Sequence, residues 1–249
     1  MRLGGFCVSF LLLLSAVFGP VNEARSSAIG NWEKSSRSWN NTHMTRIKAA
    51  MIAAGHRVDP DSPITAASLR SAVYVFGEPT VTPTAAELDL LRHFVRDGGM
   101  LMIFGDTGID LVSYNSLLAS VGSTITFTAT TVGTTSALPE GQFTRAPTRI
   151  TGGSLTVSSG NGTAGGTLID NNYARFEQIG SGYVLTFGDR IDHNDVISDI
   201  NTDLLLNAVS LAIGPVFQVP ALSPWLLVLL ALLTCAFAAG RLRLASRSV

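Results

Sequence analysis

The sequence predicts an α/β fold with a mainly parallel sheet that helices cover on both faces. Two short apolar runs, residues 73–76 and 100–104, have the length and the β-branched and large apolar composition of buried strands. Between them, apolar residues recur at helical spacing over residues 88–95. Two buried strands joined by an amphipathic helix form a βαβ unit, whose crossover is almost always right-handed. The strands are therefore expected as central parallel neighbours, with Val75 and Ile103 fully buried.

Signals for both ends of the helix support this unit. Thr84 and Glu87 have the spacing of a capping box, and Pro83 suits a first helical turn. Gly98 and Gly99 follow the last apolar residues and end the helix. The helix is thus predicted from local sequence at both its start and its end.

The remaining elements are expected on both sides of this unit. Upstream and directly downstream we predict a strand at residues 26–31, a helix capped by Asn41 or Thr42 and ending at Ala54, a short strand at 56–59 and a helix at 114–121. Residues 123–167 are rich in Thr, Ser and Gly and are expected to form β strands and long loops inserted into or packed against the core; a surface loop is the alternative for 144–166. An antiparallel hairpin at 174–178 and 183–187 and a last helix, capped by Asn201 or Thr202, complete the domain.

The N-terminal segment is expected to direct export. Residues 1–24 are predicted to be a signal peptide, because Arg2 precedes an apolar core at residues 6–18. Cleavage is expected between Gly19 and Ala28, and an uncleaved anchor is the alternative. The α/β domain is assigned to residues 25–214, followed by a linker at residues 215–220.

The C-terminal segment has the composition of a membrane span. Residues 221–240 are apolar and long enough to cross a bilayer as one transmembrane helix, and Trp225 lies near the start of the segment. Residues 241–249 form a basic tail that contains three arginines. The positive-inside rule places this tail in the cytoplasm and the α/β domain outside it.

A short motif opens this C-terminal region. It consists of Val219, Pro220, Ala221, Leu222, Ser223, Pro224 and Trp225. The order of motif, apolar helix and basic tail resembles the PEP-CTERM class of bacterial C-terminal sorting signals, most closely its variant opening Ile-Pro-Thr-Leu. The resemblance covers residues 219–249 only. It implies an exosortase-like processing enzyme as a partner and a Gram-negative bacterium with an exopolysaccharide-linked surface system. A plain single-pass anchor is the alternative.

Composition excludes several classes of function. The chain has 249 residues and a net charge of −1, and it has no basic stripe, so nucleic acid is not an expected partner. Its two cysteines, Cys7 and Cys235, lie in the terminal apolar segments. Residues 25–214 therefore contain no disulfide, no cysteine-ligated metal and no thiol nucleophile.

The elements together resemble a known fold family. The parts that carry the resemblance are a TPTAAEL helix start followed by DGG, a strand ending in FGD, and a late GYVLTFGD hairpin strand followed by the LLLNAVSLA helix. From about residue 29 to 212 this pattern is similar to the class I glutamine amidotransferase-like fold, most closely to its non-catalytic exported branches. The resemblance implies three layers around a flavodoxin-like sheet. The family's catalytic cysteine has no counterpart in the turn at residues 105–108, so amidotransferase chemistry is not expected.

Candidate ligand-binding residues follow the predicted strands, because ligands of open parallel sheets bind beyond the carboxyl ends of the strands. They are Asn31, Trp32, Glu78, Asp106, Thr107, Asp189 and His193. Glu78 and Asp106 follow neighbouring strands, so repulsion between their charges is expected to raise one pKa. The alternative role for Asp106 and Asp189 is to cap turns. Trp32, together with Trp39, either offers a sugar-stacking face or anchors its loop to the core.

Two classes of function remain open. The first is a non-catalytic, surface-displayed binding or structural module, and the second is a hydrolase of envelope or polysaccharide material with an Asp-based or metal-assisted site. No catalytic residue, cofactor or metal ligand is assigned, because the acidic residues between 189 and 203 are irregularly spaced and also suit a helix N-terminus. The expected partners are the membrane, the processing enzyme and a polysaccharide or other envelope component. The expected location is the inner membrane facing the periplasm, or the cell surface after processing.

Overall fold

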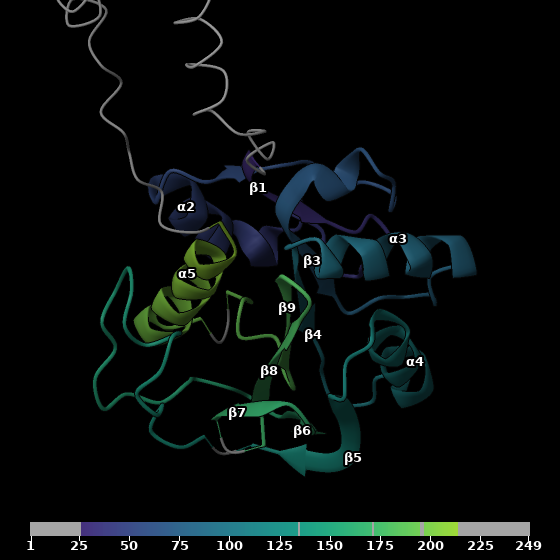
Figure 1. The fold of residues 1–249 in the computed structure, drawn as a ribbon. Coiled ribbons are helices and arrows are strands. Elements are labelled where there is room, and N and C mark those ends of the chain that lie inside the picture. Colours follow the sequence, from purple (N-terminus) through teal and green to yellow (C-terminus); the bar gives the residue numbers. More distant parts are fainter. Residues whose placement is uncertain (1–25, 134, 171, 195–196, 214–249) are drawn as a thin grey trace, which may run out of the picture. The chain divides into compact units, whose positions relative to one another are not determined.

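The computed structural model describes residues 26–133, 135–170, 172–194 and 197–213. These residues form an α/β domain around a seven-stranded sheet with the order β2-β1-β3-β4-β9-β8-β7, and β5 and β6 form a separate two-stranded sheet (Figure 1). The predicted signal peptide, linker, transmembrane helix, sorting motif and basic tail lie outside the described residues. Within the described ranges, no helix has the length and apolar character that a membrane crossing requires.

The elements have the following bounds. The strands are β1 Ser26–Asn31, β2 Arg57–Val58, β3 Ser71–Gly77, β4 Met100–Phe104, β5 Thr126–Val132, β6 Gly160–Ala164, β7 Thr167–Asp170, β8 Ala174–Ile179 and β9 Gly182–Phe187. The α-helices are α2 Thr45–Ala53, α3 Ala85–Arg96, α4 Leu111–Val121 and α5 Asp199–Ile213, and short 3-10 turns lie at Thr42–Met44 and Ser68–Arg70.

The predicted βαβ unit lies at the centre of the main sheet. β3 is parallel to β4, with Val75 opposite Met102, and β4 is parallel to β9. β1 and β2 continue the parallel part beyond β3, whereas β8 and β7 add antiparallel strands beyond β9. Val75 is 1% and Ile103 is 0% exposed, which confirms both expected central strands. The expected antiparallel hairpin is also confirmed, as β8 and β9.

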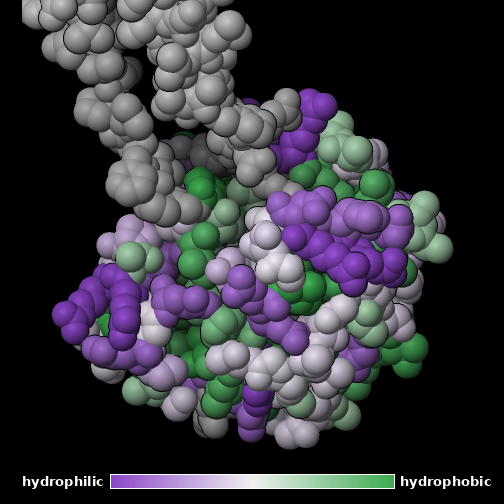
Figure 2. Space-filling view, viewed as in Figure 1, coloured by the Kyte–Doolittle hydropathy of each residue, from purple (hydrophilic) through white to green (hydrophobic). Residues whose placement is uncertain are grey.

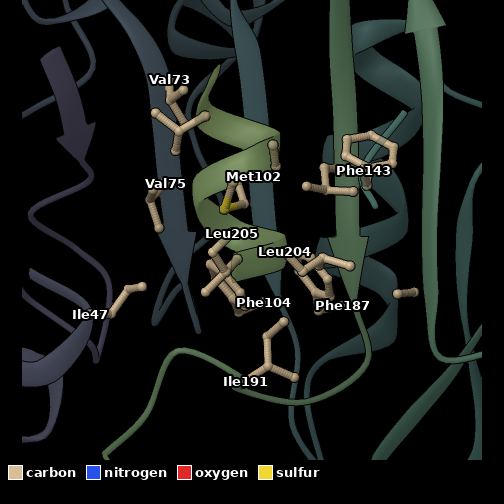
Figure 3. Close-up of a cluster of buried hydrophobic side chains, with 14 of the residues drawn as sticks. Ile47, Val73, Val75, Met102, Phe104, Phe143, Phe187, Ile191, Leu204 and Leu205 are labelled. Atoms are coloured by element: carbon tan, nitrogen blue, oxygen red, sulfur yellow. The ribbon is translucent and has the colours of Figure 1, made fainter. Parts of the chain in front are cut away.

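Helices cover both faces of the sheet. Successive strand residues point to opposite faces, and because the central strands are apolar throughout, both faces have to be buried. On one face, Ile103 of β4 belongs to a buried cluster that includes Leu91 of α3 and residues of α4. On the other face, Met102 packs in a second cluster with Ile47 of α2 and Leu205 of α5 (Figure 3). The continuous apolar sequence of the central strands follows from this burial on both sides.

The helix starts are set by side-chain caps. The Thr84 hydroxyl accepts a hydrogen bond from the backbone N–H of Glu87 (3.3 Å), and the Glu87 carboxylate accepts one from the N–H of Thr84 (2.7 Å), which confirms the capping box of α3. α4 begins at Leu111, three residues before the expected start. The reason is that Asp110 caps it, accepting from the N–H of Val112 at 3.1 Å.

The expected caps of the last helix are wrong. α5 begins at Asp199, before Asn201 and Thr202, because the Ser198 hydroxyl accepts a hydrogen bond from the N–H of Asn201 (3.2 Å). The Asn201 side chain is fully buried and is used elsewhere. It accepts from the N–H of Thr156 (2.9 Å) and donates to the carbonyl of the same residue (2.8 Å), so it binds a distant loop to α5.

The threonine- and glycine-rich stretch is packed against the core, as expected, and contributes β5, β6 and the edge strand β7. Its loop is held to α5 by a second buried asparagine. Asn207 donates to the carbonyls of Phe143 (2.8 Å) and Thr148 (2.7 Å) and accepts from the N–H of Thr148 (2.9 Å). Ile150 and Leu155 are buried, so the surface-loop alternative does not describe this part of the stretch.

Candidate functional site

The carboxyl ends of β1, β3, β4 and β9 lie at one end of the sheet, here called the carboxyl edge, because these four strands are parallel neighbours. Asn31 is the last residue of β1, and Glu78 directly follows β3. Asp106 and Asp189 each follow their strand by two residues. The predicted candidates are therefore delivered to the same edge, and the contacts of each decide which of them form a site.

Glu78 and Asp106 are brought together by two arginines that the sequence analysis did not select. The Arg190 Nε atom lies 2.8 Å from Glu78 Oε1 and 3.0 Å from Asp106 Oδ2. The Arg37 Nε atom lies 3.2 Å from the other Glu78 oxygen. The side chains of Arg190, Glu78 and Asp106 are only 16%, 17% and 23% exposed. We call Glu78, Asp106, Arg190 and Arg37 the strand-end cluster.

The two carboxyl groups of the cluster have pKa values displaced in opposite directions. Burial is the largest cause that raises the pKa of Glu78, and the neighbouring Asp106 carboxyl raises it further, against the opposing effects of Ser36 and the arginines. Burial also acts to raise the pKa of Asp106, but hydrogen bonds from Glu78 and from the Thr107 N–H, together with Arg190, lower it overall. One pKa of the pair is thus raised, as expected, although burial and not repulsion is the largest cause.

The backbone at Glu78 is unusual for a residue with a side chain. Its φ angle is +52°, in the left-handed region that favours glycine. Its carbonyl accepts a hydrogen bond from Ser36 N–H (2.9 Å), and its N–H lies 3.4 Å from the carbonyl of Phe104. Such conformations persist where the surroundings fix the residue, and they concentrate at functional sites. This turn therefore aims the Glu78 carboxylate into the strand-end cluster.

Asp106 has the capping role considered for it and also forms an ion pair. One carboxylate oxygen pairs with Arg190, and the other accepts a hydrogen bond from the N–H of Thr107 at 2.6 Å. Thr107 itself is exposed beside the cluster. Asp189 is different, because its carboxylate is buried and accepts from Ser158 (N–H, 2.8 Å) and from the N–H of Arg190 (2.7 Å). It supports the backbone next to the cluster and is not part of it.

The candidates after β1 are held inside the protein. Asn31 donates to the carbonyl of Arg37 (3.0 Å) and to Asp61 (2.7 Å). Trp32 is fully buried and packs on Phe76, with ring centroids 5.0 Å apart. Trp39 is also buried, at 3% exposed. The sugar-stacking interpretation is therefore wrong for these rings, which anchor their loop to the core.

His193 lies outside the strand-end cluster as well. Its ring stacks on His43, with centroids 4.3 Å apart and an angle of 19° between the planes. The next residue, Asn194, donates to the carbonyl of Thr42 (2.7 Å) and accepts from the N–H of Arg46 (3.1 Å). These contacts fasten the loop after β9 to the start of α2.

Unpaired polar atoms also concentrate at the carboxyl edge. Most of the described buried side-chain atoms without a hydrogen-bond partner belong to the end of β1 and to the loops after β1 and β9; they are in Asn31, Trp32, Ser35, Arg37, Trp39, Arg190 and Asp192. Buried polar groups of native proteins nearly always have partners, so such a concentration marks a place where water or a ligand completes the bonding. No group of three or more metal-ligating side chains is found among the residues that the structure describes.

Two surface hollows lie away from this edge. One, of about 440 Å³, lies on the exposed face of α4. The surface of α4 has no charged residue, whereas α3 carries several and is more hydrophilic (Figure 2). The other, of about 390 Å³, is lined by residues that include Phe143, Leu168 and Phe176, next to the edge strand β7. Neither is lined by a residue of the strand-end cluster.

Comparison with known proteins identifies the fold but no family. No protein-family model matches the chain, and no curated protein matches it significantly. Among solved structures, the mmIFT52 N-terminal domain is 14% identical with a TM-score of 0.60, covering 75% of this chain and 97% of that one. A cytoplasmic protein of Salmonella typhimurium LT2 is 13% identical with a TM-score of 0.54, covering 73% and 97%.

A third similar structure is an enzyme much longer than this domain. The β-galactosidase of Rahnella sp. R3 is 11% identical with a TM-score of 0.52, and the match covers 80% of this chain but only 32% of the enzyme. The chain thus spans about a third of that protein. At these identities the likeness concerns the fold alone, and function has to be argued from the site.

Proposed function

We propose that this chain is an exported bacterial protein, membrane-anchored or surface-sorted, whose α/β domain is a non-catalytic binding or structural module on an amidotransferase-like sheet. The observation that carries this proposal is the strand-end cluster. Its two carboxylates are engaged by Arg190 and Arg37, and residues 25–214 contain no cysteine for thiol chemistry. The Asp106 carboxylate, whose pKa is lowered, is a poor proton acceptor, so the cluster suits recognition better than acid–base work.

The strand order supports the proposed scaffold. The five parallel strands follow the order β2-β1-β3-β4-β9, the 2-1-3-4-5 order of flavodoxin-like sheets. In such sheets the ligand site lies beyond the carboxyl ends, where the exposed Thr107 borders the strand-end cluster. We propose a polysaccharide or another envelope component as the ligand of this edge.

One observation favours the alternative, a hydrolase of envelope or polysaccharide material. The pKa of Glu78 is raised while that of Asp106 is lowered. Paired carboxyl groups whose environments push their pKa values apart are the arrangement that separates a general acid from a base. A test of the proposed function must therefore measure both binding and bond cleavage.

Purified full-length protein, mixed with purified bacterial exopolysaccharide, is expected to co-sediment with it and to release no reducing ends. Asp106→Asn should weaken co-sedimentation by about tenfold or more, the effect of losing one charged hydrogen bond. Arg149→Met, which changes an exposed arginine on another part of the domain, should leave binding unchanged. Release of reducing ends that Asp106→Asn abolishes would instead establish the hydrolase.

The cellular location of the domain and the processing of its tail are tested separately. An alkaline phosphatase reporter fused after Gly214 is expected to be active, because the signal peptide proposed at residues 1–24 places the domain outside the cytoplasm.

If the sorting motif is processed, changing Pro220 and Trp225 together should leave the tail uncut, which mass spectrometry detects as a larger mature mass. An unchanged mature mass in this variant would favour a plain membrane anchor over a sorting signal. In the reporter experiment, an inactive but well-expressed fusion would contradict the proposed export.

A further inference from the structure

The segment that follows β9 is fastened at both of its ends. We call residues 189–194 the strap. Near its start, Arg190 forms the ion pairs with Glu78 and Asp106 described above. At its end, Asn194 makes hydrogen bonds to the first turn of α2, and its N–H donates to the carbonyl of His43 at 2.8 Å. Its middle is held as well, because the Asn201 side chain of α5 donates to the carbonyl of Ile191 at 3.1 Å. The strap thus lies over the carboxyl edge between two fastened ends.

The middle of the strap places a carboxyl group inside the protein. Asp192 is 2% exposed, and neither of its carboxylate oxygens has a hydrogen-bond partner. Its neighbour Ile191 is fully buried and points toward Phe104 and Phe187 at the ends of β4 and β9 (Figure 3). An ionised carboxylate that loses its water and gains no hydrogen bond is strongly disfavoured.

Charged and titratable groups face Asp192 from every side of the strap. Burial is the largest effect and raises the pKa of Asp192 to about 7, while its own backbone N–H, Arg190 and Arg37 act to lower it and Glu78 acts to raise it. The other groups around the strap are Asp106 beyond β4, Tyr173 before β8, His43 at the start of α2, and Asp189 and His193 within the strap itself. The two arginines are already paired with the carboxylates of the strand-end cluster, so they do not offset the burial of this carboxyl.

We propose that the strap is a pH-sensitive latch, closed over the carboxyl edge while Asp192 is protonated and released when Asp192 ionises. The ionised carboxylate regains water only if the strap lifts away from the ends of β4 and β9. Lifting the strap draws Arg190 from Glu78 and Asp106 and exposes the strand-end cluster to solvent. Access to this edge is therefore gated by pH, whatever ligand the edge binds.

Trypsin cleavage after Arg190 reports the open strap in the full-length protein. At pH 8.5 the ionised form of Asp192 exceeds the neutral form about 30-fold, because each pH unit above a pKa of about 7 multiplies the ratio by ten. Relative to Asp192→Asn at the same pH, cleavage at the Arg190–Ile191 bond is therefore expected to be faster in the wild type already at pH 6, because the carboxyl of the open strap is ionised there, and this ratio should rise about tenfold more between pH 6 and pH 8.5. Comparing variants at the same pH removes the pH dependence of trypsin itself.

Two variants separate Asp192 from other titrating groups. Asp203→Asn makes the same substitution at a partly exposed position of α5 and should behave as the wild type. His43→Gln removes one of the stacked imidazoles and should keep the pH dependence. Equal cleavage of the wild type and Asp192→Asn at pH 8.5 would overturn the latch, as would loss of the pH dependence in His43→Gln.

Hydrogen exchange of the wild type gives a test that needs no variant. The N–H of Asn194 is bonded to the carbonyl of His43 when the strap is closed. Its protection, corrected for the intrinsic rate, is expected to fall about tenfold between pH 6 and pH 8.5. The N–H of Tyr183 in β9, bonded to the carbonyl of Gly99, should stay protected. Unchanged protection of the Asn194 amide would contradict the proposal.

Discussion

Replacing Arg190 with methionine is expected to lower the free energy of unfolding at pH 7 by about 3 kcal/mol, near the lower end of the range for breaking a buried ion pair. The reason is that Glu78 and Asp106 would remain mostly buried and face each other without the guanidinium that now lies 2.8 and 3.0 Å away. The expected loss of stability lies at this lower end for two reasons. The side chains of Glu78 and Asp106 are 17% and 23% exposed, so water still reaches them, and Arg37 still contacts Glu78. Urea denaturation measures it.

The loss should depend on pH, with a sign that follows from the two pKa shifts. Asp106 has a lowered pKa, so its contribution to stability is present above its unfolded pKa and is lost as the pH falls through the folded one. Glu78 has a raised pKa, so its contribution is full below the unfolded value and is lost as the pH rises through the folded one. Both carboxyls are neutral in strong acid and need no counter-charge there.

The difference between wild type and Arg190→Met is therefore expected to be largest at pH 7 and above and to shrink toward pH 3. Arg149→Met is the matched control, because Arg149 pairs with Glu140 at the surface, with exposures of 71% and 67%. Its effect should be below about 0.5 kcal/mol. The same loss at every pH, or an equal loss in the control, would show that Arg190 does not act through its charge.

Gly188→Ala is expected to destabilise the domain by about 3 kcal/mol or to prevent folding. Gly188 follows β9, and a Cβ atom there would overlap the backbone carbonyl oxygen of Asn161 in β6. The obstacle is backbone, which cannot turn aside as a side chain can. The hydrogen bonds Asn161 N–H to Gly188 (2.9 Å) and Gly188 N–H to Tyr173 (2.8 Å) hold the segments at this distance.

Gly133→Ala is the control for this substitution. A Cβ at Gly133 would meet its nearest neighbour, the carbonyl oxygen of Ser158, at an ordinary 3.6 Å. Thermal unfolding of the soluble fraction should therefore place Gly133→Ala close to the wild type and Gly188→Ala far below it. Similar melting temperatures for the two variants would mean that β6 does not approach the end of β9 as closely as described.

The central part of the fold could be predicted because its signals are local. The strands β3 and β4 are short, continuous apolar runs, and the helix between them carries a capping box at Thr84 and Glu87. Burial on both faces explains why these strands lack an alternating pattern. The hairpin of β8 and β9 follows from two short strand-like segments around a short glycine turn.

The outer parts could not be predicted because they depend on contacts between distant residues. The caps expected at Asn201 and Thr202 were wrong because Asn201 bonds to Thr156 of the loop packed against α5. The starts of α4 and α5 depend on Asp110 and Ser198, whose capping role has no strong pattern beside the apolar residues that follow.

The candidate site was predicted in part for the same reason. Strand ends in a parallel sheet converge, so Glu78 and Asp106 could be selected from topology alone. Arg37 and Arg190 lie in polar loops far apart in the sequence, and only folding brings them to the same carboxylate. The sequence also does not reveal that Trp32 is buried, because an aromatic residue in a loop suits both a binding surface and the core.

The most direct test of the central claim, that Arg190 holds the strand-end carboxylates as a paired cluster, is a double-mutant cycle between Arg190→Met and Glu78→Gln. Urea denaturation of the wild type, both single variants and the double variant at pH 7 gives the coupling free energy. Residues in one ion-pair network couple by about 0.5–3 kcal/mol, and we expect about 2 kcal/mol for this partly buried pair. A coupling indistinguishable from zero would contradict the paired cluster and, with it, the non-catalytic role proposed for this edge.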